Sequence, residues 1–281
     1  MSITIRPLVE ADLPVVDRIL QSAFDRTHSF IPMLRLNGAA QPGNQCVAIL
    51  DDRVVATVGA VDFGRFAYVA LMGVDPAYHR RGIARKMMEY VLARLDEHGC
   101  PVVLLDATEA GAALYEQLGF VDDSQAYEYE GDVTGASGFA GGSVELMTPD
   151  MLAEVSAFDR IRFGADRGTV LQILLAETPD RALVARDAQG RITGYAFARV
   201  VLGPWVADDI ETAEQLLDAA VRLDGEPSAH VLVPRSNQWA VELLERRGLH
   251  RIRRLRHMRR GGTGAQGDPE CLFGQVSFGL G

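Results

Sequence analysis

The chain has few cysteines, no long apolar run and no recognisable targeting segment. Its three cysteines are far apart in the sequence, and no CxxC pair occurs: Cys46, Cys100 and Cys271. This spacing argues against a zinc ribbon or a disulfide framework and favours buried free thiols in a reducing compartment. No stretch approaches the ~20 apolar residues of a membrane helix. The first residues lack the basic start and apolar core of a secretory signal, so we expect a cytoplasmic protein.

Positive charge is also scarce. The 281 residues include 28 lysines and arginines against 38 aspartates and glutamates, for a net charge of −10. Such a surface repels polyanions and argues against a general nucleic-acid binder. Hydrophobic residues make up 48% and charged residues 23%, as in ordinary globular proteins. At roughly 100–200 residues per domain, the length suggests two domains.

Helix and strand patterns occur twice along the chain, on either side of a glycine-rich linker at 131–143. Alternating or continuous apolar runs predict strands, and 3.6-residue periodicity predicts helices. In the first half we expect strands at 3–6, 46–50, 53–61, 66–74, 101–106 and from 120, with helices at 10–23, 83–98 and 110–118. In the second half we expect strands at 142–147, 181–187, 192–202 and 229–234, with helices at 149–158, 212–223 and 239–247.

The two halves also match locally. AALYEQLGF at 112–120 aligns without gaps with VELLERRGL at 241–249, and both place a glycine directly after a short amphipathic helix. An internal duplication is the natural explanation. We therefore expect an α/β protein with two related domains, residues 1–132 and 143–281.

The most specific local pattern is MGVDPAYHRRGIARKMM at 72–88, where a strand runs through a turn into a long helix. The start of a helix has unpaired N–H groups and a partial positive charge. Gly82 leaves room for a ligand there, and four cations lie within seven residues: Arg80, Arg81, Arg85 and Lys86. This combination predicts a pyrophosphate site. Neither GxxxxGK nor GxGxxG occurs in the segment.

Two segments resemble the GNAT superfamily of acyl-CoA-dependent N-acyltransferases. HRRGIA at 79–84 resembles its motif A, with His79 in place of the usual glutamine or arginine. DATEAGAALYEQLGF at 106–120 is similar to a later strand–helix segment of the family, with Thr108 where asparagine is commoner. The resemblance implies tandem GNAT-like domains, each a mixed, mostly antiparallel central sheet flanked by helices. It also implies direct acetyl transfer from acetyl-CoA to a primary amine, without a metal.

The resemblance assigns roles to residues of the first half. Main-chain groups of Met72, Gly73 and Val74 would pair with the pantetheine arm. Six consecutive N–H groups would hold the pyrophosphate, those of Arg80, Arg81, Gly82, Ile83, Ala84 and Arg85. Tyr115 would protonate the departing thiolate; the alternative is a packed tyrosine whose hydroxyl bonds to the backbone.

A base is needed because the amine must attack in its neutral form. Deprotonating an alkyl ammonium with a pKa near ~10.4 costs about 4.6 kcal/mol at pH 7. Asp106 and Glu109 are candidate bases near the end of a buried strand. For Asp106, a helix N-cap is an equally good interpretation.

The second half has no counterpart of HRRGIA. The corresponding helix start is acidic, with Asp208, Asp209, Glu211 and Glu214, and Leu244 stands where the first half has Tyr115. We expect like-charge repulsion to exclude a pyrophosphate there and predict one acetyl-CoA per chain.

Three further runs, FGADR at 163–167, GYAFAR at 194–199 and LGPWVADD at 202–209, resemble the C-terminal domain of a subgroup of bacterial two-domain acetyltransferases. Near the first of these, Asp159, Asp166 and Arg167 fit either a ligand pocket or helix capping with a surface ion pair.

The last cluster, RIRRLRHMRR at 251–260, holds six arginines. We interpret it as the exposed face of a strand beside the acidic first half, with polyanion binding as the alternative. The expected partner is a small-molecule or peptide amine, with no nucleic acid and no membrane. A homodimer is compatible with the sequence, which leaves the oligomeric state open. The alternative function is a non-catalytic acyl-CoA sensor or regulatory module.

Overall fold

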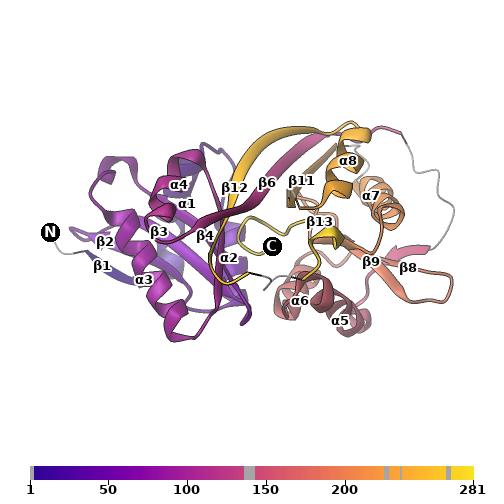
Figure 1. Ribbon diagram of the computed structural model, residues 1–281, viewed down its shortest axis with the longest axis horizontal. Helices are drawn as coiled ribbons and strands as arrows, with labels where there is room; N and C mark the ends of the chain where they lie inside the picture. Colours follow the sequence, from indigo (N-terminus) through magenta and orange to yellow (C-terminus); the bar gives the residue numbers. More distant parts are fainter. Residues whose placement is uncertain (1–2, 136–142, 225–227, 235, 264–266) are drawn as a thin grey trace.

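The computed structural model describes residues 3–135, 143–224, 228–234, 236–263 and 267–281 (Figure 1). Residues 136–142 of the predicted linker lie outside this set. The first half contains strands β1 (Thr4–Pro7), β2 (Gln45–Leu50), β3 (Arg53–Asp62), β4 (Ala67–Val74), β5 (Val102–Ala107) and β6 (Val121–Asp132). Its helices are α1 (Leu13–Phe24), α2 (Ile31–Ala40), α3 (Ile83–Glu97) and α4 (Glu109–Glu116), with short 3₁₀ turns η1 (Glu10–Asp12) and η2 (Pro76–Tyr78).

The second half repeats this order of elements. Its strands are β7 (Ser143–Leu146), β8 (Ala182–Arg186), β9 (Ile192–Phe197), β10 (Trp205–Ala207), β11 (Ser228–Pro234), β12 (His250–Gly261) and β13 (Leu272–Gly274). Its helices are α5 (Leu152–Phe163), α6 (Gly168–Glu177), α7 (Ile210–Asp224) and α8 (Gln238–Arg246), with 3₁₀ turns η3 (Pro149–Met151) and η4 (Pro269–Cys271).

The strands form two sheets, of order β1-β2-β3-β4-β5-β12-β6-β11 and β13-β10-β9-β8-β7. Only β4 and β5 pair in parallel among the described strands; all other pairs are antiparallel. The predicted α/β fold with mixed, mostly antiparallel sheets is therefore confirmed.

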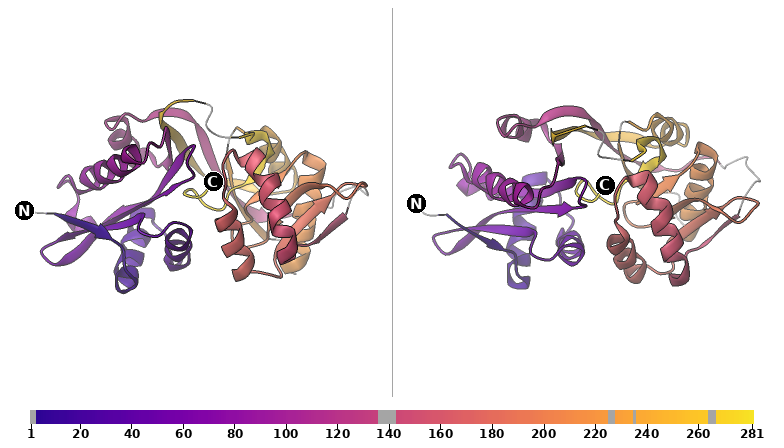
Figure 2. Two further views of the ribbon diagram at one scale, coloured as in Figure 1. Left: turned by 90° about the horizontal axis from the view of Figure 1, so that it is seen from below. Right: turned by 60° about the horizontal axis from the view of Figure 1, so that its bottom comes forward.

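One strand crosses from the second half into the first. β12 lies between β5 and β6, while the far end of β6 pairs with β11 of the second half. Figures 1 and 2 show β6 and β12 running together across the molecule. Without β12, β5 and β6 would each lose a partner and leave unpaired backbone groups. The domain boundaries at 132 and 143 stay a prediction, and the halves they separate share one sheet.

The helices cover both sheets and link the halves. α3 packs over the first-half strands through Ile83, Met87 and Val91. α7 and α8 bury the side chains of β8–β11 and the end of β6. α2 was not predicted, and Leu36 on it packs among residues of α6 in the second half. None of the described helices is long and apolar enough to span a membrane.

The arginine-rich segment is confirmed as a strand beside the acidic half. The arginines of β12 form ion pairs with carboxylates of the first half: Arg254–Glu109 (3.6 Å), Arg256–Glu116 (2.7 Å), Arg256–Asp122 (2.6 Å), Arg259–Asp123 (2.7 Å) and Arg260–Asp96 (2.9 Å). Arg251 lies over the Tyr127 ring, 4.6 Å from its centroid. These arginines thus have acidic or aromatic partners within the chain.

Candidate active site

The loop before α3 holds an unusual run of free backbone amides. The carboxylate of Asp75 accepts the Ala77 amide at 2.9 Å, and the His79 ring bonds to the Val74 carbonyl at 2.9 Å, which fixes the turn. In the described chain, none of the amides from Arg80 to Arg85 has a backbone or side-chain acceptor, and the first bond back into the helix is Lys86 N–H to the Gly82 carbonyl. Free donors at the start of a helix are of the kind that bind anions in proteins.

Gly82 gives this loop its shape. Its φ of +73° lies in the left-handed region, where a side chain is strained, and Arg80 has a φ of +59°. A Cβ at Gly82 would meet no atom within 4 Å, so the space in front of the amides is open. Both residues are exposed, and the Arg81 guanidinium lies 5.1 Å from the Tyr78 ring centroid.

β4 and β5 separate directly beside this loop. They pair only through Ala67–Val103 and Tyr68–Leu104. Beyond Tyr68, β4 has a register irregularity against β3 and a positive φ at Leu71, and such a bulge increases local twist. Further along β4, Gly73 and Val74 pair with β3, and none of the described strands pairs with their other edge. The predicted pantetheine contact, Met72–Val74, therefore lies at an open strand edge.

Tyr115 lies on α4 and packs against the first-half core. Its ring makes an edge contact with Phe120, with centroids 6.0 Å apart. The hydroxyl makes no hydrogen bond to another described residue, which argues against the interpretation as a backbone-bonded tyrosine. Burial raises the pKa of Tyr115 to about 12, so the hydroxyl is protonated at neutral pH.

Of the two candidate bases, Asp106 is buried and Glu109 is exposed. Thr108 caps α4 by accepting the Gly111 amide, so the interpretation of Asp106 as the N-cap was wrong. Asp106 lies on β5, two residues past the last pair with β4. Its Oδ1 lies 2.8 Å from His257 Nδ1, and its Oδ2 is buried without a hydrogen-bond partner in the described structure. The Glu109 side chain is 71% exposed and lies 3.6 Å from Arg254.

Two family models account for both halves. The acetyltransferase (GNAT) family model matches residues 13–120, and an acetyltransferase (GNAT) domain model matches residues 155–274. The chain belongs to the GNAT superfamily.

Among curated GNAT relatives, the uncharacterized N-acetyltransferase YitH of Bacillus subtilis is 27% identical over 180 residues, 58% of this chain and 59% of YitH. Human N-alpha-acetyltransferase 30 is 32% identical over 68 residues, 23% of this chain and 19% of that protein. The chain thus spans less than two thirds of the length of either relative.

Solved GNAT structures share the fold. The crystal structure of a candidate acetyltransferase from Pyrococcus horikoshii superposes with a TM-score of 0.86, over 99% of this chain and 96% of its own, at 24% identity. A GCN5-related N-acetyltransferase from Sphaerobacter thermophilus gives 0.69 over 92% and 95%, at 15% identity. Since both chains are covered almost fully, the two-part architecture is shared.

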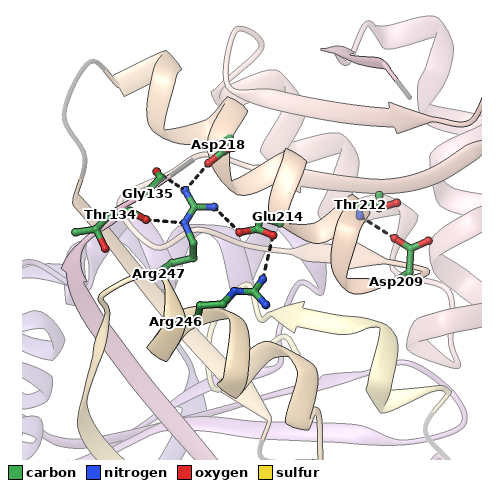
Figure 3. Close-up of polar contacts among 8 residues, drawn as sticks. All are labelled: Thr134, Gly135, Asp209, Thr212, Glu214, Asp218, Arg246 and Arg247. Carbon is green, nitrogen blue, oxygen red and sulfur yellow. Dashed lines mark hydrogen bonds and ion pairs between the residues drawn. The ribbon is translucent and has the colours of Figure 1, made fainter. Parts of the chain in front are cut away.

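At the corresponding helix start of the second GNAT half, the predicted acidic residues have partners within the chain (Figure 3). Asp209 stands before α7 where Gly82 stands before α3, and its carboxylate accepts the Thr212 amide at 2.7 Å. Glu214 is 5% exposed and pairs with Arg246 and Arg247, each at 3.0 Å. Asp208 pairs with Arg162. Much of the expected negative charge is thus neutralised, and a carboxylate already satisfies an amide of this helix start.

The gap corresponding to that between β4 and β5 is also filled in the second half. β13 pairs with β10, and the Gln275 amide donates to the Leu232 carbonyl of β11 at 2.8 Å. Phe273 of β13 is 1% exposed and stacks on Trp205, with ring centroids 5.5 Å apart. Leu244, at the position of Tyr115, is fully buried. The chain itself therefore fills, in the second half, the gap that corresponds to the one between β4 and β5.

Sequence reasoning missed His257, which approaches Asp106 from β12. The residue lies inside the arginine cluster, whose charge dominated the pattern, and its partner lies 151 residues away. The available signal was the register: once β12 is placed beside β5, His257 pairs with Asp106.

Proposed function

We propose that this chain transfers an acetyl group from acetyl-CoA directly to a primary amine, with the donor bound in the first half. The observation that carries the proposal is the run of six amides from Arg80 to Arg85 that have no acceptor among the described residues, with open space at the Cβ position of Gly82. A diphosphate supplies the acceptors that these donors lack. The open edge of β4 at Met72–Val74 fits an extended amide-containing arm, which would pair with it like an added strand.

Tyr115 is the proposed donor to the leaving sulfur. A tyrosine with a pKa of about 12 is a weaker acid than a thiol near ~8.5, so complete proton transfer costs roughly 5 kcal/mol. We therefore expect Tyr115 to hydrogen-bond to the sulfur as the C–S bond breaks, with protonation completed afterwards. Preorganised donors at developing charge lower barriers without needing full transfer.

The cysteines support direct transfer over a covalent enzyme intermediate. Burial is the main cause that raises the pKa of Cys46 above its usual value and that of Cys100 and Cys271 to about 11 each. Thiols with such pKa values carry little thiolate at neutral pH and are poor nucleophiles. The amine itself is then the attacking group, and the buried Asp106 carboxylate is the proposed acceptor of its proton.

A thiol-release screen separates this proposal from the sensor alternative. The full chain is incubated with acetyl-CoA and pools of primary amines, from polyamines and amino acids to short peptides, and free thiol is measured. Release that depends on an amine supports acetyl transfer. Saturable acetyl-CoA binding with no release above hydrolysis in any pool would instead support the sensor.

Gly82→Glu tests the anion site. The carboxylate would stand in front of the free amides, so we expect acetyl-CoA to bind at least roughly tenfold more weakly, about 1.4 kcal/mol by calorimetry. Gly99→Glu is a matched control, because Gly99 has the same φ of +73° and the same open space at the other end of α3. The two variants share the backbone strain, so equal affinities in folded proteins would contradict the assignment.

Titration of the full chain tests the division between the halves. Asp209 and β13 occupy the second site, so we expect acetyl-CoA to saturate at one equivalent per chain. Gly82→Glu should weaken acetyl-CoA binding at this single site. Two equivalents, or a site that survives Gly82→Glu and is lost on changing Asp209, would contradict the assignment.

A further inference from the structure

β12 places a histidine of the second half against the candidate base of the first. His257 pairs with Asp106 in the antiparallel register between β12 and β5, so both side chains emerge on the same face of the sheet. The Asp106 side chain is 0% exposed and that of His257 is 9% exposed, with 2.8 Å between Oδ1 and Nδ1. Such a short contact between buried groups fixes the orientation of both.

The second oxygen of Asp106 lacks a donor. Oδ2 is buried and has no hydrogen-bond partner in the described part of the chain. An unsatisfied buried acceptor is destabilising, and more so when it is charged. Because Asp106 stands two residues past the last β4–β5 pair, it lies where the two strands separate. An N–H donor entering this gap would satisfy Oδ2.

Two carboxylates raise the pKa of His257, and Tyr68 lies beside its ring. Burial by itself lowers the pKa of His257, but the charge and hydrogen bond of Asp106 on β5, with a smaller effect of Asp123 on β6, outweigh it and raise the pKa above 6.5. The Tyr68 ring on β4 lies 6.3 Å from the imidazole. Arg167 of the second half faces Tyr68 and is paired with Asp159. The cationic form of His257 is thus favoured by the carboxylate beside it.

We propose that His257 is a positioning residue for the acceptor amine, which acts by holding Asp106 so that Oδ2 faces the amine nitrogen. This inference rests on the proposed acetyl transfer. As the nitrogen attacks the thioester carbon and the N–C bond forms, the nitrogen loses one proton to Asp106 Oδ2. The C–S bond breaks while the Tyr115 hydroxyl donates a hydrogen bond to the leaving thiolate. The thiolate then takes one proton from solvent, and Asp106 releases the proton it accepted to solvent. The second half thereby supplies part of the acceptor site.

Kinetics on the full chain test the positioning role, with butylamine as the probe amine and thiol release as the readout. His257→Ala should lower kcat/KM for butylamine about tenfold while acetyl-CoA affinity stays unchanged. His257→Asn keeps an N–H donor near the place of Nδ1 and should recover activity to within about threefold of wild type. His250→Ala, an exposed histidine on the same strand, is the control and should leave the rate unchanged.

A double variant and a pH profile separate positioning from mere packing. Asp106→Asn should remove the benefit of His257, so that His257→Ala adds little further loss in its presence. The acid limb of kcat/KM should also shift in His257→Ala and be restored toward wild type in His257→Asn. Additive losses, or an Asn variant as impaired as the Ala variant, would overturn the proposal.

Nuclear magnetic resonance distinguishes a wrong positioning role for His257 from a wrong assignment of acetyl transfer. In chain labelled with ¹⁵N-histidine, butylammonium should shift the His257 ring resonances in wild type and not in Asp106→Asn. Thiol release without such shifts would overturn the positioning role and leave acetyl transfer standing. Shifts without release of thiol, for butylamine and in the amine screen, would support the amine site and overturn acetyl transfer. If neither the resonance shifts nor thiol release were observed, both the positioning role and acetyl transfer would be overturned.

Discussion

Replacing Tyr115 by phenylalanine is expected to lower kcat by roughly 10²-fold or more, while acetyl-CoA affinity barely changes. The hydroxyl makes no hydrogen bond to another described residue, so its removal leaves no partner unsatisfied. The ring keeps its edge contact with Phe120 and its place in the core. Any loss of rate therefore reports the chemistry of the hydroxyl. Single-turnover thiol release measures it independently of product dissociation.

Tyr90→Phe is the matched control for this experiment. Tyr90 also packs against the first-half core, and it lies on α3, where the Arg94 guanidinium is 5.9 Å from its ring centroid. Loss of this hydroxyl should leave kcat within about twofold of wild type. If Tyr115→Phe behaved in the same way, Tyr115 would be a packing residue and another group would have to stabilise the leaving thiolate.

Local chemistry explains why the turn and the glycine before α3 could be predicted from the sequence, whereas the role of this loop as an anion site stays a prediction. The glycine before α3, the cations around it and the turn at Asp75-Pro76 act within one short segment, so their meaning does not depend on distant parts of the chain. The strands on either side of the loop are rich in apolar and β-branched residues, whose preference for strands also acts locally, so these strands could be predicted as well. The structure places Gly82 in the left-handed region directly before α3, as such a loop requires.

Elements whose apolar residues face several neighbours were missed. α2 packs on strands of its own half and on α6 of the other half, so its apolar residues do not form a single stripe. α6 is similarly surrounded, with Val170, Leu171 and Leu174 all buried. A helix buried on several sides loses the periodicity that marks an amphipathic one.

The insertion of β12 between β5 and β6 could not be derived from the sequence, because the pairing of strands depends on residues far apart in the chain. The pattern RIRRLRHMRR indicated a strand and its charge indicated an acidic neighbour, but many strand orders satisfy both. The order found puts His257 beside Asp106 and the arginines beside carboxylates of the first half. The contribution of the second half to the candidate site follows from this pairing alone.

Asp159→Asn is expected to destabilise the protein by about 3–5 kcal/mol, because it removes one partner of a buried ion pair. Asp159 and Arg167, the last residue of the FGADR segment, form neither the predicted surface pair nor part of an open pocket, because Asp159 is 1% exposed and Arg167 is 2% exposed. Both oxygens of Asp159 accept from Arg167 at 2.9 Å, and the Tyr195 hydroxyl donates to one of them at 2.6 Å. Asp166, one residue before the N-cap of α6, accepts the Gly168 amide at 2.8 Å.

The same cluster ties the end of the described chain to the first half. Arg167 donates to the Gly281 backbone oxygen at 2.7 Å, and a Cβ on Gly281 would lie 3.2 Å from the Tyr68 ring of β4. Asparagine keeps the shape of Asp159 and removes its charge, which leaves the Arg167 guanidinium buried without a counter-charge from this position. The effect of charge is thereby separated from that of cavity formation.

Asp96→Asn is the control for Asp159→Asn, since Asp96 also accepts two hydrogen bonds from one arginine, Arg260, at 2.9 and 3.0 Å. Its side chain is 49% exposed, so solvent screens the pair and the expected loss is below about 1 kcal/mol. Urea unfolding at neutral pH compares the two variants with wild type. Because both lose one carboxylate facing one arginine, the difference between them reports burial together with the Tyr195 hydrogen bond of Asp159. Equal losses would mean that the Asp159–Arg167 pair is no more important for stability than a surface pair.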